Sequence, residues 1–74
     1  EVEGGLTDAL DKLSPKLREA IVLRFYADCT YKEMGEIMDC SLNTARSRLR
    51  LAIERLRTHL GDEQVRWLAT ETIR

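Results

Sequence analysis

Hydrophobic residues recur with helical spacing along most of this chain. Leu17, Ile21 and Phe25 lie four residues apart, and further along Leu49 and Leu56 belong to a similar stripe. A helix with 3.6 residues per turn brings such positions onto one face, which then packs against a neighbouring helix. The pattern predicts an all-α fold, a small bundle of four to five helices.

Residues that favour helix starts divide the first part of the chain into two helices. We expect Thr7 to cap a short helix that runs through Leu13. Ser14 and Pro15 mark the start of the second helix, with Ser at the cap and Pro at the first helical position. The apolar stripe of this second helix fades near Asp28. The predicted apolar face of the first helix consists of Leu6, Leu10 and Leu13.

Two further helices are predicted with a short turn between them. Residues 30–33 read Thr-Tyr-Lys-Glu, a capping box in which the Thr30 and Glu33 side chains accept hydrogen bonds from each other's backbone amides. The short helix that begins here ends at Asp39, and Ser41 caps a longer helix that ends at Gly61. Two helices joined by about three residues, the second polar and basic at its start, are typical of a helix-turn-helix. The expected apolar stripes are Met34, Ile37 and Met38 in the first helix, and Ala45, Leu49, Ala52, Ile53, Leu56 and Leu60 in the second.

The turn contains residues that suit this motif. Gly35 lies in the middle of a predicted helix, where it costs roughly 1 kcal/mol relative to alanine. That cost is acceptable if the second helix must cross close to this position, where only a small residue fits. Asp39 is one of the few non-glycine residue types that tolerate a left-handed backbone, and Cys40 is expected to point inward as a small apolar residue.

Length and composition are those of one small domain. The chain has 74 residues, of which 43% are hydrophobic and 34% charged, which excludes a disordered or fibrous protein. No apolar run approaches the roughly 18 residues of a membrane span, and no signal-peptide pattern opens the chain, so we expect a cytoplasmic domain without membrane insertion. We divide it into a linker remnant at 1–5, the helix-turn-helix domain at 6–60 and a tail at 61–74. The tail is expected to form a short helix over 63–73, with Trp67 packing it against the domain.

The distribution of charge points to a nucleic-acid partner although the net charge of −1 does not. Residues 42–60 contain five arginines against the single acid Glu54, a local net charge of +4. With one acid among five arginines, few of these charges can be neutralised within the helix, which argues against an ordinary solvated face with ion pairs. The positive charge therefore marks the second helix of the motif as the element that meets DNA.

The side chains on that helix are suited to reading base edges. Asparagine pairs bidentately with adenine and arginine with guanine, while serine and threonine can either donate or accept a hydrogen bond. Thr30, Tyr31 and Lys32 begin the preceding helix, where amides and the helix dipole attract a phosphate, and Arg48 lies to one side of the reading helix. The predicted base-reading residues are Asn43, Thr44, Arg46, Ser47 and Arg50; the predicted phosphate contacts are Thr30, Tyr31, Lys32 and Arg48.

Other site chemistry finds little support in the sequence. Cys29 and Cys40 lack the spacing of a metal pair and His59 is the single histidine, so we expect free buried thiols and no metal or cofactor. No Ser/His/Asp or Cys/His arrangement is plausible, and we expect no enzymatic activity.

Much of the chain is similar to a known family. The segment LDKLSPKLREAIVLRFYADCTYKEMGEIMDCSLNTARSRLRLAIERLR resembles region 4 of bacterial sigma-70-family factors, especially the extracytoplasmic-function type. The resemblance implies a helical domain that places its last helix in the −35 promoter element for transcription initiation, close to the bacterial nucleoid. It also implies contact with the flap of the RNA polymerase β subunit through apolar surface, and inhibition by an anti-sigma factor.

The chain departs from the family pattern at two positions. The family commonly has Arg-Ala where this chain has Leu51 and Ala52, which removes a basic contact and exposes an apolar side chain to a partner. Asn43 stands where a glycine is common, and this changes the expected base preference. Region 2 of such factors is missing from this chain, which is therefore expected to be either a fragment or a stand-alone relative. The acidic, Gly-containing start favours a fragment cut in the interdomain linker.

Two alternative functions remain open at this point. The DNA-binding output domain of a response regulator shares the capping and turn pattern but usually carries Thr-Val-Lys-x-His where this chain has residues 44–48, Thr-Ala-Arg-Ser-Arg. A helix-turn-helix used mainly for protein interaction, such as anti-sigma binding, would present Leu51, Ile53 and Trp67 near its surface.

Overall fold

The fold was analysed in a computed structural model, which describes residues 8–61. The predictions for the linker at 1–5, for Leu6 and Thr7, and for the tail helix with Trp67 lie outside the described residues. Within residues 8–61 every regular element is helical, which confirms the predicted all-α fold. Their order is α2 (Pro15–Ile21), η1 (Val22–Tyr26), α3 (Tyr31–Met38) and α4 (Leu42–Leu60), preceded by a helical turn at 8–11.

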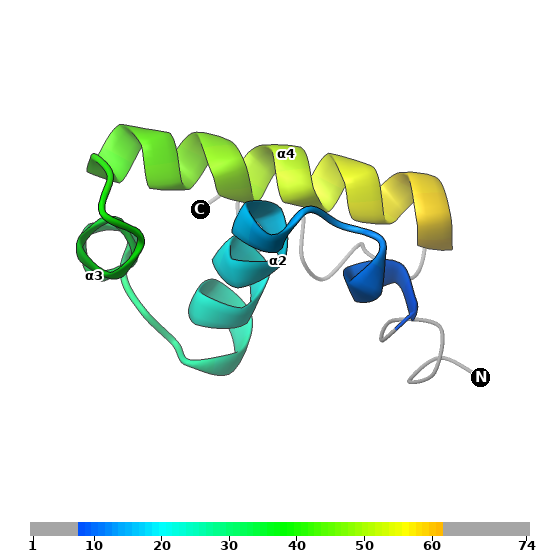
Figure 1. The fold of residues 1–74 in the computed structure, drawn as a ribbon, viewed down its shortest axis with the longest axis horizontal. Coiled ribbons are helices and arrows are strands. Elements are labelled where there is room, and N and C mark those ends of the chain that lie inside the picture. The colour runs from blue at the N-terminus through cyan, green and yellow to red at the C-terminus, as the bar shows by residue number, and fades with distance from the viewer. Residues whose placement is uncertain (1–7, 62–74) are drawn as a thin grey trace.

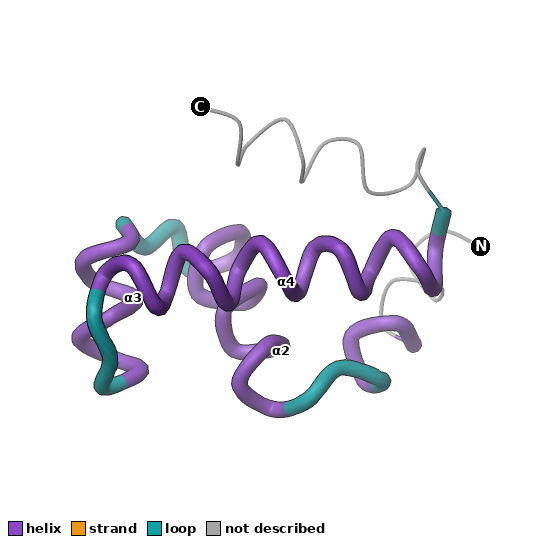
Figure 2. The backbone as a smooth tube through the Cα atoms, turned by 90° about the horizontal axis from the view of Figure 1, so that it is seen from above, coloured by secondary structure: helices purple, strands orange, loops and turns teal. Residues whose placement is uncertain are grey.

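The long helix α4 organises the domain. It has 19 residues, which corresponds to a length of about 28 Å. As Figure 1 shows, α4 spans the top of the molecule, with α3 beneath one end and α2 beneath its middle. The same arrangement from above shows α4 running across the other helices (Figure 2). Helix α4 therefore forms the helix-turn-helix together with α3 and packs against α2 in the core.

The core lies between α4 and the elements beneath it. The largest fully buried side chains are Ile21, Met34, Leu49 and Leu56, one from α2, one from α3 and two from α4. The apolar stripe expected for α4 is confirmed for Ala45, Leu49, Ala52, Ile53 and Leu56, which are all buried, whereas Leu60 is only partly buried against the core. Burial of this stripe, rather than helix propensity, accounts for most of the stability that such helices gain.

The helix that begins at Pro15 changes its geometry before it ends. Ser14 precedes it with an extended backbone and Pro15 is its first residue, as expected, although the Ser14 side chain makes no capping hydrogen bond. From Val22 to Tyr26 the helix widens to π geometry, and the Ala27 amide donates to the Val22 carbonyl at 3.0 Å. Asp28, with φ of 59°, then turns the chain towards α3.

The turn between α3 and α4 depends on Asp39 within it and on Gly35 in α3. Asp39 has φ 59° and ψ 49°, the left-handed conformation expected from the sequence. A Cβ atom on Gly35 would lie 2.7 Å from the Cys40 carbonyl oxygen and 3.3 Å from the Leu42 nitrogen. Gly35 is therefore needed because the turn leading into α4 lies directly against α3.

Several packing expectations were wrong. Ile37, expected in the apolar stripe of α3, is 54% exposed. Ile53 is buried, as the apolar stripe of α4 predicts, and does not lie near the surface as the protein-interaction alternative would require. Both thiols are half-buried rather than buried, and Cys40 only partly fills the inward place expected for it. The helical turn before α2 ends at residue 11, two residues before Leu13, although Leu13 itself packs into the core.

Residues 8–61 contain neither a membrane-spanning helix nor a cluster of metal-binding side chains. None of the helices there combines the length and apolar character needed to cross a bilayer. Nor do any three His, Cys, Asp or Glu side chains in this range come together as a group able to hold a metal ion.

Candidate nucleic-acid interface

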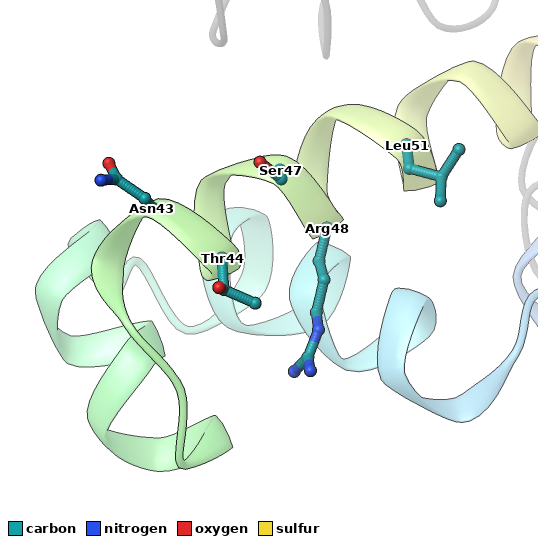
Figure 3. A pocket seen from close by; sticks show the side chains of 5 residues that line it. All are labelled: Asn43, Thr44, Ser47, Arg48 and Leu51. Atoms are coloured by element: carbon teal, nitrogen blue, oxygen red, sulfur yellow. The ribbon is translucent and has the colours of Figure 1, made fainter.

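The exposed face of α4 presents the predicted base-reading residues near its N-terminus. All five of them are exposed: Asn43, Thr44, Arg46, Ser47 and Arg50. Figure 3 shows three of these side chains, together with Arg48 and Leu51, around an open surface depression of about 280 Å³. A two-turn segment of helix with outward polar side chains has the dimensions that the major groove admits.

The start of α4 is fixed by its cap. The Ser41 hydroxyl oxygen accepts a hydrogen bond from the Thr44 amide at 3.0 Å and donates to the Thr44 hydroxyl oxygen at 2.9 Å. These two hydrogen bonds tie the Thr44 side chain to the cap. Thr44 is thus held in place at the edge of the exposed face.

Arg46 and Arg48 flank the middle of this face on opposite sides. At 100° per residue, each lies about 100° from Ser47, one in either direction. Arg48 is half-buried, and its guanidinium Nη1 lies 3.7 Å from the Cys40 sulfur. Arg46 is exposed and extends over the Tyr31 ring, with its guanidinium carbon 5.2 Å from the ring centroid. Arg48 therefore lies to one side of this face, and Arg46 lies equally far from its centre on the other side.

The arginines near the start of α4 have no acid paired with them within residues 8–61. Among residues 8–61, Arg46, Arg48 and Arg50 form no ion pair, in contrast to Arg18, whose Nη1 lies 3.5 Å from the Asp11 carboxylate. An arginine without a carboxylate partner leaves its donors available for an external acceptor. The observed geometry thus disfavours the interpretation of these arginines as members of helix ion pairs.

The N-terminus of α3 forms a second polar region. The Thr30 amide donates to the Glu33 carboxylate at 2.8 Å, and the Glu33 amide donates to the Thr30 hydroxyl at 3.1 Å, which confirms the predicted capping box. The amides of Tyr31 and Lys32 in the same turn have no carbonyl partner within an α-helix. Lys32 is exposed and Tyr31 half-buried, so this end of the helix combines two available amides with one ammonium group.

Sequence reasoning missed Arg24, which lies next to this region. Its guanidinium carbon lies 5.0 Å from the centroid of the Tyr31 ring, and its Nη1 donates to the Cys29 carbonyl at 3.0 Å. Arg24 reaches the ring from η1, seven residues earlier in the chain. No spacing rule connects the two positions, so the sequence contains no signal for this contact.

Comparison with known proteins identifies the family. The family model described as sigma-70, region 4, matches residues 4–56 of this chain, which include α2, α3 and most of α4. The chain belongs to the sigma-70 region 4 family. This assignment confirms the resemblance drawn from the motifs and places the helix-turn-helix among sigma factors rather than response regulators.

Individual relatives of the region 4 domain are also sigma factors. RNA polymerase sigma factor SigV of Bacillus subtilis is 35% identical over 60 residues, which are 81% of this chain and 36% of that protein. The ECF RNA polymerase sigma-E factor of Haemophilus influenzae is 39% identical over 66% of this chain and 26% of its own length. ECF RNA polymerase sigma factor SigE of Mycolicibacterium smegmatis is 38% identical over 76% of this chain.

The chain spans between about a fifth and about a third of these relatives, 22% of SigE and 36% of SigV. No solved structure gives a significant match to it. The comparisons therefore establish the region 4 family, and the partners and contacts of this domain have to be argued from its own residues.

Proposed function

We propose that this domain recognises the −35 element of a promoter, as part of an alternative sigma factor that directs RNA polymerase to initiate transcription. The observation that carries the proposal is the exposed, cationic N-terminal half of α4, presented by a helix-turn-helix of the region 4 family. In such motifs the second helix enters the major groove, and its first turns contact base edges. The role is one of binding, and no catalytic group is required for it.

Base recognition in this proposal belongs to the outer face of α4. Asn43 is suited to adenine, Arg46 and Arg50 to guanine, and Thr44 and Ser47 to either kind of partner. The fixed Thr44 hydroxyl supplies a hydrogen-bonding group at this edge. Leu51, 40% exposed and next to Ser47 in the same depression, offers an apolar contact of the kind that a thymine methyl group accepts.

Backbone contacts in this proposal come from the edges of the motif. A phosphate at the N-terminus of α3 would meet the amides of Tyr31 and Lys32 and the Lys32 ammonium, assisted by the helix dipole. Thr30 lies at the same end, and Arg48 would contact the other flank of the groove. Such contacts fix the register of the protein on DNA without reading sequence.

The polymerase contact is assigned to an apolar groove on α2 and η1. An open groove of about 540 Å³ is lined by Pro15, Lys16, Arg18, Glu19, Val22 and Leu23. Val22 is 40% exposed and Tyr26, one turn later, is 58% exposed. The combination of exposed apolar side chains with charged groups at the rim is suited to a protein partner, here the β flap or an anti-sigma factor. A chain with these partners acts in the cytoplasm at the nucleoid.

Substitution of Arg46 by alanine tests the base-reading role. We expect a loss of about 1–3 kcal/mol on the preferred duplex and a relaxed preference at one base pair, because a bidentate guanine contact disappears. Lys32→Ala is the comparison variant: it removes a phosphate contact and is expected to weaken binding to all sequences alike. Binding is measured by fluorescence anisotropy, with the preferred duplex first selected from a library randomised over one major-groove turn.

Salt titration of the same complexes separates the two classes of contact. Lys32→Ala should make the slope of log affinity against log salt concentration shallower by about one unit. Equal losses on preferred and random duplexes for Arg46→Ala would contradict the base-reading role. Absence of DNA binding by the unmodified chain at low salt would contradict the proposed function itself and favour the protein-interaction module.

A further inference from the structure

The Tyr31 ring lies within reach of two guanidinium groups from different elements. Arg24 of η1 is 5.0 Å from the ring centroid and Arg46 of α4 is 5.2 Å from it. A guanidinium within about 6 Å of an aromatic ring is attracted by the negative face of the ring. The ring of one residue in α3 thus connects the π-helix to the exposed face of α4.

The ring itself is held firmly. Tyr31 is the first residue of α3, directly after the capping box, and its half-buried side chain packs against the hydrophobic core. Arg24, which also contacts the ring, is tied to the backbone by its hydrogen bond to the Cys29 carbonyl. The ring is therefore a fixed surface and not a side chain that swings freely in solvent.

Arg46 has little else to restrain it. Its side chain is exposed, and within residues 8–61 it forms neither a hydrogen bond nor an ion pair through its guanidinium. A free arginine of this length samples many rotamers, and ordering it on binding costs free energy. Contact with a fixed ring reduces that cost, because fewer rotamers are populated before DNA arrives.

We infer that Tyr31 is a positioning residue: its ring, rather than its hydroxyl, holds the Arg46 guanidinium in the orientation that reads DNA. This inference rests on the proposed function, in which Arg46 contacts a base, and it changes the role expected for the Tyr31 side chain. The phosphate contact at this end of α3 then belongs to the backbone amides and Lys32. Tyr31 acts on sequence preference through Arg46.

Substitutions that keep or remove the ring test this inference. Tyr31→Phe keeps the ring and loses the hydroxyl, and we expect its affinity and base preference to stay within about twofold of the unmodified chain. Tyr31→Leu removes the ring, and we expect a roughly 3- to 10-fold loss of preference at the base pair that Arg46→Ala identifies. The Tyr31→Leu/Arg46→Ala double variant should show no further loss of that preference beyond Arg46→Ala alone, because the two residues act as one unit.

Three results would overturn the inference. Tyr31→Phe could lose as much as Tyr31→Leu, which would assign the effect to the hydroxyl. The losses of Tyr31→Leu and Arg46→Ala could add in the double variant, which would make the residues independent. Tyr31→Leu could weaken all duplexes equally with an unchanged preference, which would leave Tyr31 with a structural or backbone role alone.

A measurement without substitution protects the test if Tyr31→Leu fails to fold. In the unmodified free chain, NMR should show the δ-methylene protons of Arg46 shifted upfield by the ring current of Tyr31, and Arg50, which is also exposed, serves as the internal reference. Random-coil shifts for Arg46 would overturn the inference. This measurement needs no DNA, so its outcome does not depend on the proposed function. The proposed function fails if the unmodified chain selects no sequence from the randomised duplex library.

Discussion

Replacing Leu49 by alanine is expected to lower the free energy of unfolding by about 2–5 kcal/mol. Leu49 is completely buried on the face of α4 that packs into the core, so truncation removes apolar burial and leaves a cavity. Small domains have a free energy of unfolding of roughly 5–15 kcal/mol, and the loss is therefore a large part of the total. Urea unfolding followed by far-ultraviolet circular dichroism measures the change.

Leu51→Ala is the matched control for this prediction. It makes the same truncation two residues later in α4, at a side chain that is 40% exposed, and we expect a change within about 0.5 kcal/mol. A loss as large for Leu51 as for Leu49 would show that α4 packs on a different face. The control variant also has a use in DNA binding, because Leu51 lines the depression beside Asn43 and Ser47.

Gly35→Val is expected to destabilise the domain by about 3 kcal/mol or more. The first carbon added at this position would lie 2.7 Å from the Cys40 carbonyl oxygen, and the backbone must move to relieve the contact. Overpacking of this kind costs about 1–3 kcal/mol or more, and the branched side chain gains little in helix propensity over glycine. The displaced turn should also weaken DNA binding beyond the loss of stability, because the turn sets the direction of α4.

The neighbouring residue supplies the comparison for Gly35→Val. Glu36 is exposed in the same helix, so Glu36→Val introduces the same side chain without the clash and should cost about 0.5 kcal/mol. Thermal unfolding of both variants, with anisotropy on the preferred duplex, measures the two effects. A Gly35→Val variant as stable as Glu36→Val would contradict the close approach of the turn to α3.

Local chemistry made much of the fold predictable. The capping box at Thr30 and Glu33, the Ser41 cap and the left-handed Asp39 were all expected from residue type and spacing, and all are confirmed. These features depend on a few consecutive residues, whose backbone and side chains satisfy each other's hydrogen bonds. Gly35 was predictable for a similar reason, since a glycine inside a helix is costly unless something lies close to it.

The rotation of a short helix about its own axis was not predictable. In α3 the buried side is marked by Met34 and Gly35, with Met38 half-buried, and Ile37 lies about 110° from the centre of that side. In eight residues the apolar pattern leaves the rotation ambiguous by about one position. The rotation of α3 depends on Gly35, which is buried because the turn leading into α4 lies against it. A hydrophobic pattern does not reveal such a contact between backbones. The widening of the helix at Val22–Tyr26 left no mark in the sequence pattern either.

The candidate site was predictable as a set of residue types but not as a set of contacts. The exposure of the polar positions near the start of α4 follows from the helical pattern that buries Ala45 and Leu49. The Arg24–Tyr31–Arg46 cluster joins three elements and depends on how they are placed in space. The contribution of this cluster to DNA recognition stays a prediction, which the substitutions of Tyr31 and Arg46 described above test.

The division of α4 into a buried stripe and an exposed face affects how this domain can change during evolution. Within residues 8–61 the side chains of Asn43, Ser47 and Arg50 make no hydrogen bond or ion pair, and all three are exposed. Under the proposed base-reading role, new residues at these positions would alter the preferred DNA sequence with little effect on folding. Thr44, tied to the Ser41 cap, and Arg46, which lies against Tyr31, change only together with their partners. Divergence of promoter preference among related domains should therefore begin at positions 43, 47 and 50.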